Sequence, residues 1–271
     1  MRYRVSGEPQ GAYFGTVTGL SQSPHPSPLI DRPEIIAHRG TPRAHPENSL
    51  PGFRYALDEG ADGIELDVHL TADGVVVVHH DPVVRGGGAP GAGHPIRIRD
   101  VPARELAAYP LAPGVPIPTL AEVLALVEDR AVVYVEVKAP EALDAALRCI
   151  EASEASCAVH GFDHRVALRT AHLADERPEA NARMRVPTGI LSASYLIEPV
   201  AALRAARARD YWQEWGMIDD DLVDRIHKAG GRVIAWTVDD VSDARRLADI
   251  GVDGVCTNVC GEMVRGFATR W

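Results

Sequence analysis

Segments of strand length alternate eight times with segments of helical period between Glu34 and Asn258, and this alternation predicts a (β/α)8 barrel. The eight βα units occupy about 240 residues, which is the usual size of one such barrel. Polar residues at the ends of the first three strands agree with this fold, because barrel sites lie at that edge. An open doubly wound sheet is the alternative, but no GxGxxG motif opens any expected helix.

The first βα unit begins with the short apolar run Glu34–His38, which is expected to be a strand. Gly40 follows it closely and is typical of a tight exit turn. Asn48 is a plausible N-cap, and apolar residues then recur at helical spacing until Gly60. A helix is therefore expected between Asn48 and Gly60.

The second unit contains a hairpin in the stretch 63–81, GIELDVHLTADGVVVVHHD. An Asp-Gly pair between two β-prone runs predicts a tight turn at 73–74, because both residues tolerate positive φ. Counting outward from a two-residue loop places Asp67 opposite His80, with Glu65 one pleat further along the same face. A carboxylate and an imidazole are thus expected to meet on one side of the hairpin.

The later units follow an unusual connection. The segment from about 82 to 118 is rich in Gly and Pro and is expected to be an irregular insertion after strand 2. Thr119, with Glu122 three residues later, predicts a capping box that opens the next helix. Further strands, each followed by a helix, are expected at 131–138, 156–162, 186–191, 211–215, 232–238 and 252–257.

The expected domain organisation is a single barrel over 33–271, preceded by an irregular arm over 1–32 that is rich in Gly, Pro and Ser. The net charge of −10 and the absence of a Lys/Arg-rich run argue against nucleic acid as a partner. No 18-residue apolar stretch exists, so no stable membrane insertion is expected. The N-terminus lacks a signal-peptide core, which favours a cytoplasmic location. The oligomeric state stays open.

The four cysteines show no metal-finger spacing. Cys256 and Cys260 could lie within reach of one disulfide, but reduced structural thiols agree better with a cytoplasmic location.

Seven titratable side chains follow the first three strands and can converge at one edge of a barrel. They are His38, Arg39, Glu65, Asp67, His80, Glu136 and Lys138. Glu65 and Asp67 are two residues apart, as are Glu136 and Lys138, so each pair is expected on one face of its strand. A satisfied network of internal ion pairs is one interpretation, since such networks also gather titratable groups.

A divalent cation is the other interpretation, because three buried carboxylates outnumber two basic residues and burying them is costly. Carboxylate oxygens suit Mg²⁺ or Ca²⁺ better than zinc, and Mn²⁺ is a further candidate. Two histidines can act as acid and base near neutral pH, while an arginine and a lysine attract a phosphate. The set therefore fits a small anionic phosphodiester substrate.

The motifs that carry these residues resemble those of the glycerophosphodiester phosphodiesterases. They are AHRG (37–40), PENSLPGF (46–53), GADGIELDVHLTADGVVVVHHDP (60–82), PTLAEVL (118–124), VEVK (135–138), AWTVDD (235–240) and GVDGVCTN (251–258). The resemblance covers Glu34 to Asn258 and implies a (β/α)8 barrel that hydrolyses glycerophosphodiesters to glycerol 3-phosphate and an alcohol.

The resemblance also implies a role for each residue of the set. Glu65, Asp67 and Glu136 would be metal ligands, and His38 and His80 would be the acid/base pair. Arg39 and Lys138 would contact the phosphate, and Trp236 would line the pocket for the glycerol or head group; which histidine is the acid stays open.

The chain departs from the family pattern at two places that border the substrate. After His80-Asp81-Pro82 it continues VVRGGGAPGAG instead of a leucine and an Arg-Thr-Thr stretch. After the fourth strand it has Gly161-Phe162, preceded by His160, instead of Ser-Phe. A lysophospholipase D or a phospholipase C-like enzyme is therefore an alternative, since the phosphoinositide phospholipases C share the hairpin pattern. A catalytically silent barrel that binds phosphodiesters is a third.

Overall fold

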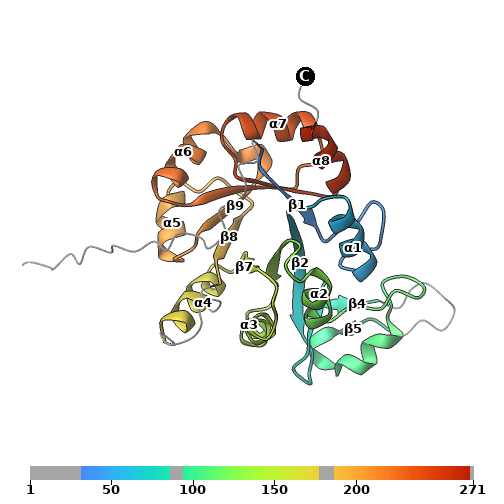
Figure 1. Ribbon diagram of the computed structural model, residues 1–271. Coiled ribbons are helices and arrows are strands. Elements are labelled where there is room, and N and C mark those ends of the chain that lie inside the picture. Colours follow the sequence, from blue (N-terminus) through green and yellow to red (C-terminus); the bar gives the residue numbers. More distant parts are fainter. Residues whose placement is uncertain (1–31, 86–93, 177–185, 269–271) are drawn as a thin grey trace, which may run out of the picture. The chain divides into compact units, whose positions relative to one another are not determined.

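The computed structural model describes residues 32–85, 94–176 and 186–268. Residues 1–31 of the expected arm lie outside that part of the chain. Eight parallel strands form a closed ring in the order β1-β2-β6-β7-β8-β9-β10-β11, with β11 pairing back to β1 (Figure 1). Ring closure confirms the (β/α)8 barrel and excludes the open sheet.

The eight barrel strands match the expected ones to within a few residues at each end. They are β1 (Glu34–His38), β2 (Gly63–Leu70), β6 (Val132–Val137), β7 (Cys157–Gly161), β8 (Thr188–Ser192), β9 (Asp210–Glu214), β10 (Arg232–Trp236) and β11 (Gly254–Thr257).

A helix follows each strand of the ring and packs on its outer side (Figure 1). The helices are α1 (Leu50–Asp58), α2 (Leu120–Val127), α3 (Leu143–Glu151), α4 (Arg165–Asp175), α5 (Pro199–Ala205), α6 (Asp220–Lys228), α7 (Val241–Asp249) and α8 (Cys260–Ala268). In the described parts of the chain, no helix combines the length and the apolar character of a membrane span.

Two apolar layers follow from the alternation of side chains along each strand. Ile35 and Ala37 of β1 belong to the layer between strands and helices, whereas Ile36 belongs to the layer inside the ring. The inner layer consists of Ile36, Tyr134, Ala158, Leu191, Trp212, Ile234 and Cys256. Side chains two positions further along these strands face the same interior, at the C-terminal mouth of the barrel.

The hairpin after β2 differs from the sequence prediction by one residue. Val68 pairs with Val78 of β3 (Val76–Val78), and His79 N donates to Asp67 O at 2.9 Å, so Asp67 lies opposite His79. The predicted pairing of Asp67 with His80 is therefore wrong.

A three-residue loop, 72–74, is the reason for the shifted register. Thr71 N donates to Val75 O at 3.0 Å, and Gly74 takes a φ of 80°. Such loops place glycine in the left-handed region, and the Thr71 hydroxyl strengthens this one by donating to Asp73 at 2.6 Å. His80 follows the end of β3, where strand alternation no longer sets its direction.

The connection from β3 to α2 is described over 82–85 and 94–118. It contains β4 (Val83–Val84) paired with β5 (Ile96–Arg97) and two 3-10 helices, Ile98–Asp100 and Ala103–Ala108. The prediction of a wholly irregular segment is wrong at these short elements, because their aliphatic residues form a small apolar cluster with Val77 of β3.

Two helix starts show how local sequence shapes the barrel. The capping box of α2 is confirmed: Thr119 Oγ1 accepts from Glu122 N at 3.2 Å, and Glu122 Oε2 accepts from Thr119 N at 2.8 Å. The N-cap of α1 is Ser49, not Asn48, because Ser49 Oγ accepts from Gly52 N. Asn48 takes a left-handed φ of 57°, which directs its side chain elsewhere.

Candidate active site

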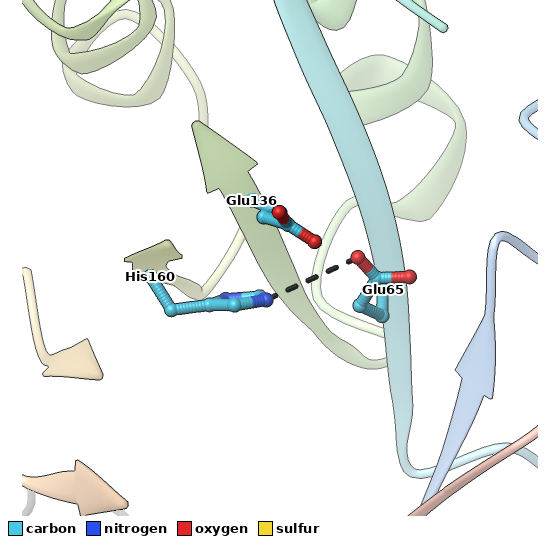
Figure 2. Close-up of side chains that lie close together, drawn as sticks. All are labelled: Glu65, Glu136 and His160. Carbon is cyan, nitrogen blue, oxygen red and sulfur yellow. Dashed lines mark ion pairs between the residues drawn. The ribbon is translucent and has the colours of Figure 1, made fainter. Parts of the chain in front are cut away.

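Glu65, Glu136 and His160 point toward one another at the mouth of the barrel, from β2, β6 and β7 (Figure 2). All three are buried, and one potential ligand atom of each lies within 4.8 Å of the other two. Glu136 and His160 come two positions after Tyr134 and Ala158 of the inner apolar layer, and Glu65 of β2 pairs with Tyr134 of β6. Strand alternation therefore explains their convergence.

Burial makes two of the carboxylates hard to ionise. The pKa of Glu65 is raised well above its usual value by desolvation and then by the charges of Asp67 and Glu136. The pKa of Glu136 is raised by desolvation and by Asp67, although Lys138 Nζ lies only 2.8 Å from its Oε1. The positive charge near Glu65 and Glu136 is therefore too small to offset their burial.

Asp67 is the carboxylate that the protein itself stabilises as an anion. Arg39 Nε and Lys138 Nζ each lie 3.2 Å from its oxygens, and Asn48 Nδ2 donates to Oδ2 at 2.8 Å. Burial raises the pKa of Asp67, but the charges of Arg39 and Lys138 and the hydrogen bond from Asn48 lower it below the usual value. Asp67 thus links the two basic residues to the carboxylate cluster.

Arg39 has a second function in the geometry of the site. It takes a left-handed φ of 52°, and its backbone N donates to Glu65 Oε2 at 3.1 Å. Its guanidinium also pairs with the exposed Glu47. The turn after β1 therefore orients Glu65 through the backbone and Asp67 through the side chain.

His38, at the end of β1, is held by a chain of hydrogen bonds from Asn258 and Asp239, which follow β11 and β10. Its Nδ1 lies 2.8 Å from Asn258 Oδ1, and Asn258 Nδ2 donates to Asp239 Oδ2 at 2.9 Å. Because Asp239 can only accept, Asn258 presents its oxygen to His38, so Nδ1 of His38 carries the proton. The other nitrogen, Nε2, faces Glu65 at 3.9 Å. Desolvation and the charge of Arg39 lower the pKa of His38.

His80 has a side chain that is more exposed to solvent than that of His38. Its Nδ1 is 2.7 Å from Asp81 Oδ1, and its side chain lines a cavity of about 370 Å³ together with Lys138. Lys138, which lines the same cavity, lies 3.2 Å from Asp67 and 2.8 Å from Glu136, so His80 borders the carboxylate cluster despite the shifted hairpin register.

Trp236 ends β10 and forms an aromatic edge to the site. Its ring meets that of Phe162 at 84° with centroids 5.5 Å apart, and Phe162 is half exposed. The structure therefore brings all eight residues singled out in the sequence to the C-terminal ends of the strands or to the hairpin beside them.

Three further residues of the site were missed in the sequence: Asn48, His160 and Asn258. Asn48 was assigned to a helix cap, and its left-handed φ depends on the turn after Arg39. His160 was noted only as a departure from the family pattern, although its place two positions after Ala158 in β7 could have placed it beside Glu136. Asn258 follows the last strand, as polar site residues do in barrels.

The donor set fits a divalent cation. Three buried carboxylates face only two basic side chains, and two of the carboxylates have raised pKa values where an anion is needed for ligation. Carboxylate oxygens are the ligands that hard divalent ions take. A network of ion pairs alone would leave more negative than positive charge among these buried groups.

The mouth of the barrel holds buried carboxylates, two histidines and two basic groups. These are the side chains that a metal-dependent phosphodiester hydrolase uses. Residues 38–262 match the model of the glycerophosphoryl diester phosphodiesterase family, and the chain belongs to that family. It is accordingly an enzyme that hydrolyses glycerophosphodiesters.

Individual relatives agree with this assignment. The chain is 30% identical to the glycerophosphodiester phosphodiesterase of Caldanaerobacter subterraneus over 83% of its own length and 93% of the relative's. It resembles the crystal structure of the Thermotoga maritima enzyme with a TM-score of 0.70 and 28% identity, over 86% of this chain and 98% of that one. A phosphodiesterase of Oleispira antarctica, solved in complex with the product sn-glycerol-3-phosphate, shares the fold with a TM-score of 0.76 and 21% identity, over 88% and 98% of the two chains.

Proposed function

We propose that the chain hydrolyses glycerophosphodiesters to glycerol 3-phosphate and an alcohol with a divalent cation held by Glu65, Asp67 and Glu136. The convergence of these buried carboxylates with His38 and His80 at one end of the barrel is the observation that carries the proposal. The product bound by the Oleispira antarctica relative supports the same chemistry.

Mg²⁺ or Ca²⁺ is the proposed ion, with Mn²⁺ as a further candidate, because the three proposed ligands offer oxygen atoms. When bound, the cation supplies positive charge to the non-bridging oxygens of the phosphodiester. Arg39 and Lys138 add positive charge from the side, and both already lie beside Asp67. Arginine is well suited to this role because its planar fork can make two hydrogen bonds to one phosphate.

The surroundings of the histidines suggest how they divide the proton transfers. His38 is kept neutral by burial and offers the free lone pair of Nε2 to the site, which suits a general base. His80 is paired with Asp81 and lies next to the solvent-open cavity, which suits an acid that protonates the leaving alkoxide. Asp239 and Asn258 act as positioning residues for His38.

The cavity beside His80 and Lys138 is the proposed place for the leaving group. Its volume of about 370 Å³ suits a small polar head group, and its lining mixes Arg97 and Arg99 with Asp81 and Glu141. Leu70, Pro82, Ile98 and Ala139 line it too, but the charged side chains favour a water-soluble diester over the lysophospholipid of the alternative lysophospholipase D. On the other side, the Trp236–Phe162 edge is proposed to contact the glycerol carbons.

A substrate panel tests the proposal. Glycerophosphocholine, glycerophosphoethanolamine and lysophosphatidylcholine are offered to the chain with Mg²⁺, Ca²⁺, Mn²⁺ or EDTA. We expect hydrolysis of the small diesters with a cation and none with EDTA. Activity that survives thorough EDTA treatment contradicts the metal-dependent mechanism, and a preference for lysophosphatidylcholine favours the lysophospholipase D alternative. Inactivity with every ion and diester favours the silent barrel.

Variants of the adjacent histidines test the acid/base assignment. His80→Ala is expected to lower kcat by about 10²–10⁴-fold, the usual contribution of a general acid. His79→Ala is the matched control and is expected to retain most activity, since among the described residues the His79 ring bonds to the Asp81 backbone and not to the carboxylates. A phosphorus-NMR time course shows whether a cyclic phosphate forms transiently, which separates attack by the glycerol hydroxyl from attack by water.

The enzyme is further proposed to act in lipid and glycerol metabolism in the cytoplasm. Its four cysteines are free thiols, which fits a reducing compartment. The net charge of −10 supports small molecules, not nucleic acids, as its ligands.

A further inference from the structure

His160 is a buried histidine that the proposed acid/base chemistry does not use. It is 1% exposed and lies at the end of β7, and neither of its ring nitrogens has a hydrogen-bond partner among the described residues. Burying a polar group without a partner costs free energy, so such a group needs an explanation.

The ring cannot turn easily toward another partner. It stacks on Trp212 with centroids 4.3 Å apart and an angle of 7°, and it meets the edge of Tyr134. This packing aims Nε2 at Glu65 Oε1, which at 3.9 Å is too distant for a hydrogen bond (Figure 2).

The gap between Nε2 and the carboxylates has the dimensions of an ion site. Ligand atoms of Glu65, Glu136 and His160 lie within 4.8 Å of one another. Bonds of about 2.1 Å around one ion place neighbouring ligand atoms roughly 3 Å apart and opposite ones about 4 Å apart, so small side-chain shifts suffice. Arg39 and Lys138 already offset the charge of Asp67, so the charges of Glu65 and Glu136 beside a neutral imidazole match a divalent ion.

We propose that His160 Nε2 is a direct ligand of the cation, together with Glu65 and Glu136, and that the site therefore prefers a divalent first-row transition ion to Mg²⁺ or Ca²⁺. This inference rests on the proposed function and refines its metal. Imidazole nitrogen favours transition ions, whereas Mg²⁺ and Ca²⁺ prefer oxygen. Carboxylates keep the site open to Mn²⁺, which makes that ion a suitable probe.

Pulsed electron paramagnetic resonance of Mn²⁺ bound to the chelator-treated full chain tests the proposal. We expect modulation from a histidine nitrogen that changes when the histidines are labelled with ¹⁵N. His160→Asn removes the imidazole and leaves a shorter amide, so oxygen from the amide or from water takes the place of Nε2. It is expected to abolish the modulation and to raise the Mn²⁺ Kd at least about tenfold, while the Ca²⁺ Kd changes less than about threefold.

His38→Asn is the matched control, because His38 Nε2 also lies 3.9 Å from Glu65. It is expected to retain the nitrogen modulation. The proposal is overturned if wild-type Mn²⁺ shows no histidine coupling, a measurement that needs no variant, or if the coupling disappears in His38→Asn and survives in His160→Asn.

The same experiment separates this proposal from the proposed function. If Mn²⁺ binds through oxygen alone and metal-dependent hydrolysis of glycerophosphocholine is intact, His160 is not a ligand. The proposed phosphodiesterase mechanism is then unaffected. Failure of the chain to bind any of the three ions, with hydrolysis unaffected by EDTA, removes both.

Discussion

Asn48 shows how a single residue can prepare a charged site. Its amide donates to Asp67 Oδ2 at 2.8 Å and accepts from the Asp67 backbone N at 3.3 Å. It does so from a left-handed backbone, a conformation that asparagine tolerates better than most residues. Asp67 is thereby oriented by the protein before any ligand binds.

Asn48→Ala is expected to lower the free energy of unfolding by about 2 kcal/mol, because the buried Asp67 N–H loses its acceptor. It is also expected to lower kcat/KM at least about tenfold, since Asp67 loses its orientation. Urea unfolding and kinetics with glycerophosphocholine measure the two effects. Ser49→Ala is the control: it removes the α1 cap at a cost of about 1 kcal/mol and should largely retain kcat/KM. Activity within twofold of wild type in Asn48→Ala would refute the orienting role.

Glu65 makes the stability of the metal-free protein depend on pH. Its folded pKa is raised, so between pH 4.5 and that pKa the folded state binds more protons than the unfolded state. Folding stability from this group therefore falls as pH rises through the window. Glu65→Gln removes the titrating group, so the stability advantage of the variant over wild type in EDTA should be small near pH 4.5 and should grow as the pH rises above it. Urea unfolding across this range is the measurement; a constant difference would be the contrary result.

At the residue scale, the sequence predicted where a residue lies along its strand better than it predicted which partners its side chain has. Glu65, Asp67 and Glu136 could be placed because two-residue spacing after an apolar strand has only one geometric outcome in a barrel. His160 has the same position in β7, but a single histidine among apolar residues gives no chemical pattern. Asn48 and Asn258 owe their contacts to backbone turns and to a pairing across the closed ring, which no local pattern encodes.

At the scale of elements, the hairpin after β2 separates what turn chemistry predicts from what it leaves open. The Asp-Gly pair correctly marked the turn, but the hydroxyl of Thr71 bonds to Asp73 and Val75 and lengthens the loop to three residues. That extra residue shifts every pair in the hairpin by one. The site survives because His80 lies beyond the last pair of β3.

The capping box of α2 gives a prediction about stability alone. Thr119→Ala is expected to lower the free energy of unfolding by about 1 kcal/mol, because Glu122 N loses its acceptor. The corresponding shift is about 2–4 °C in Tm for a chain of this size. Thr119→Ser keeps the hydroxyl and should retain wild-type Tm. Calorimetry checks both variants, and a large loss of kcat in either one would show that α2 also shapes the site.

At the scale of the whole molecule, the cation should stabilise the barrel, because its proposed ligands come from different strands. An ion at about one hundred times its Kd adds about 2.7 kcal/mol of folding stability. We therefore expect Tm to rise by about 5–10 °C between EDTA and saturating cation. Glu136→Gln should diminish the rise. Equal Tm values in EDTA and in each of Mg²⁺, Ca²⁺ and Mn²⁺ would contradict a cation shared by these strands.

The pairing of β1 with β11 has a consequence for when the enzyme becomes active during its synthesis. His38 leaves the ribosome early, but its partner Asn258 lies 220 residues later in the chain. Seven strands can be complete while His38 still lacks the amide that determines which ring nitrogen carries its proton. A nascent chain halted before β11 should therefore be unable to hydrolyse its substrate, so catalytic competence arrives with the final strand instead of growing gradually.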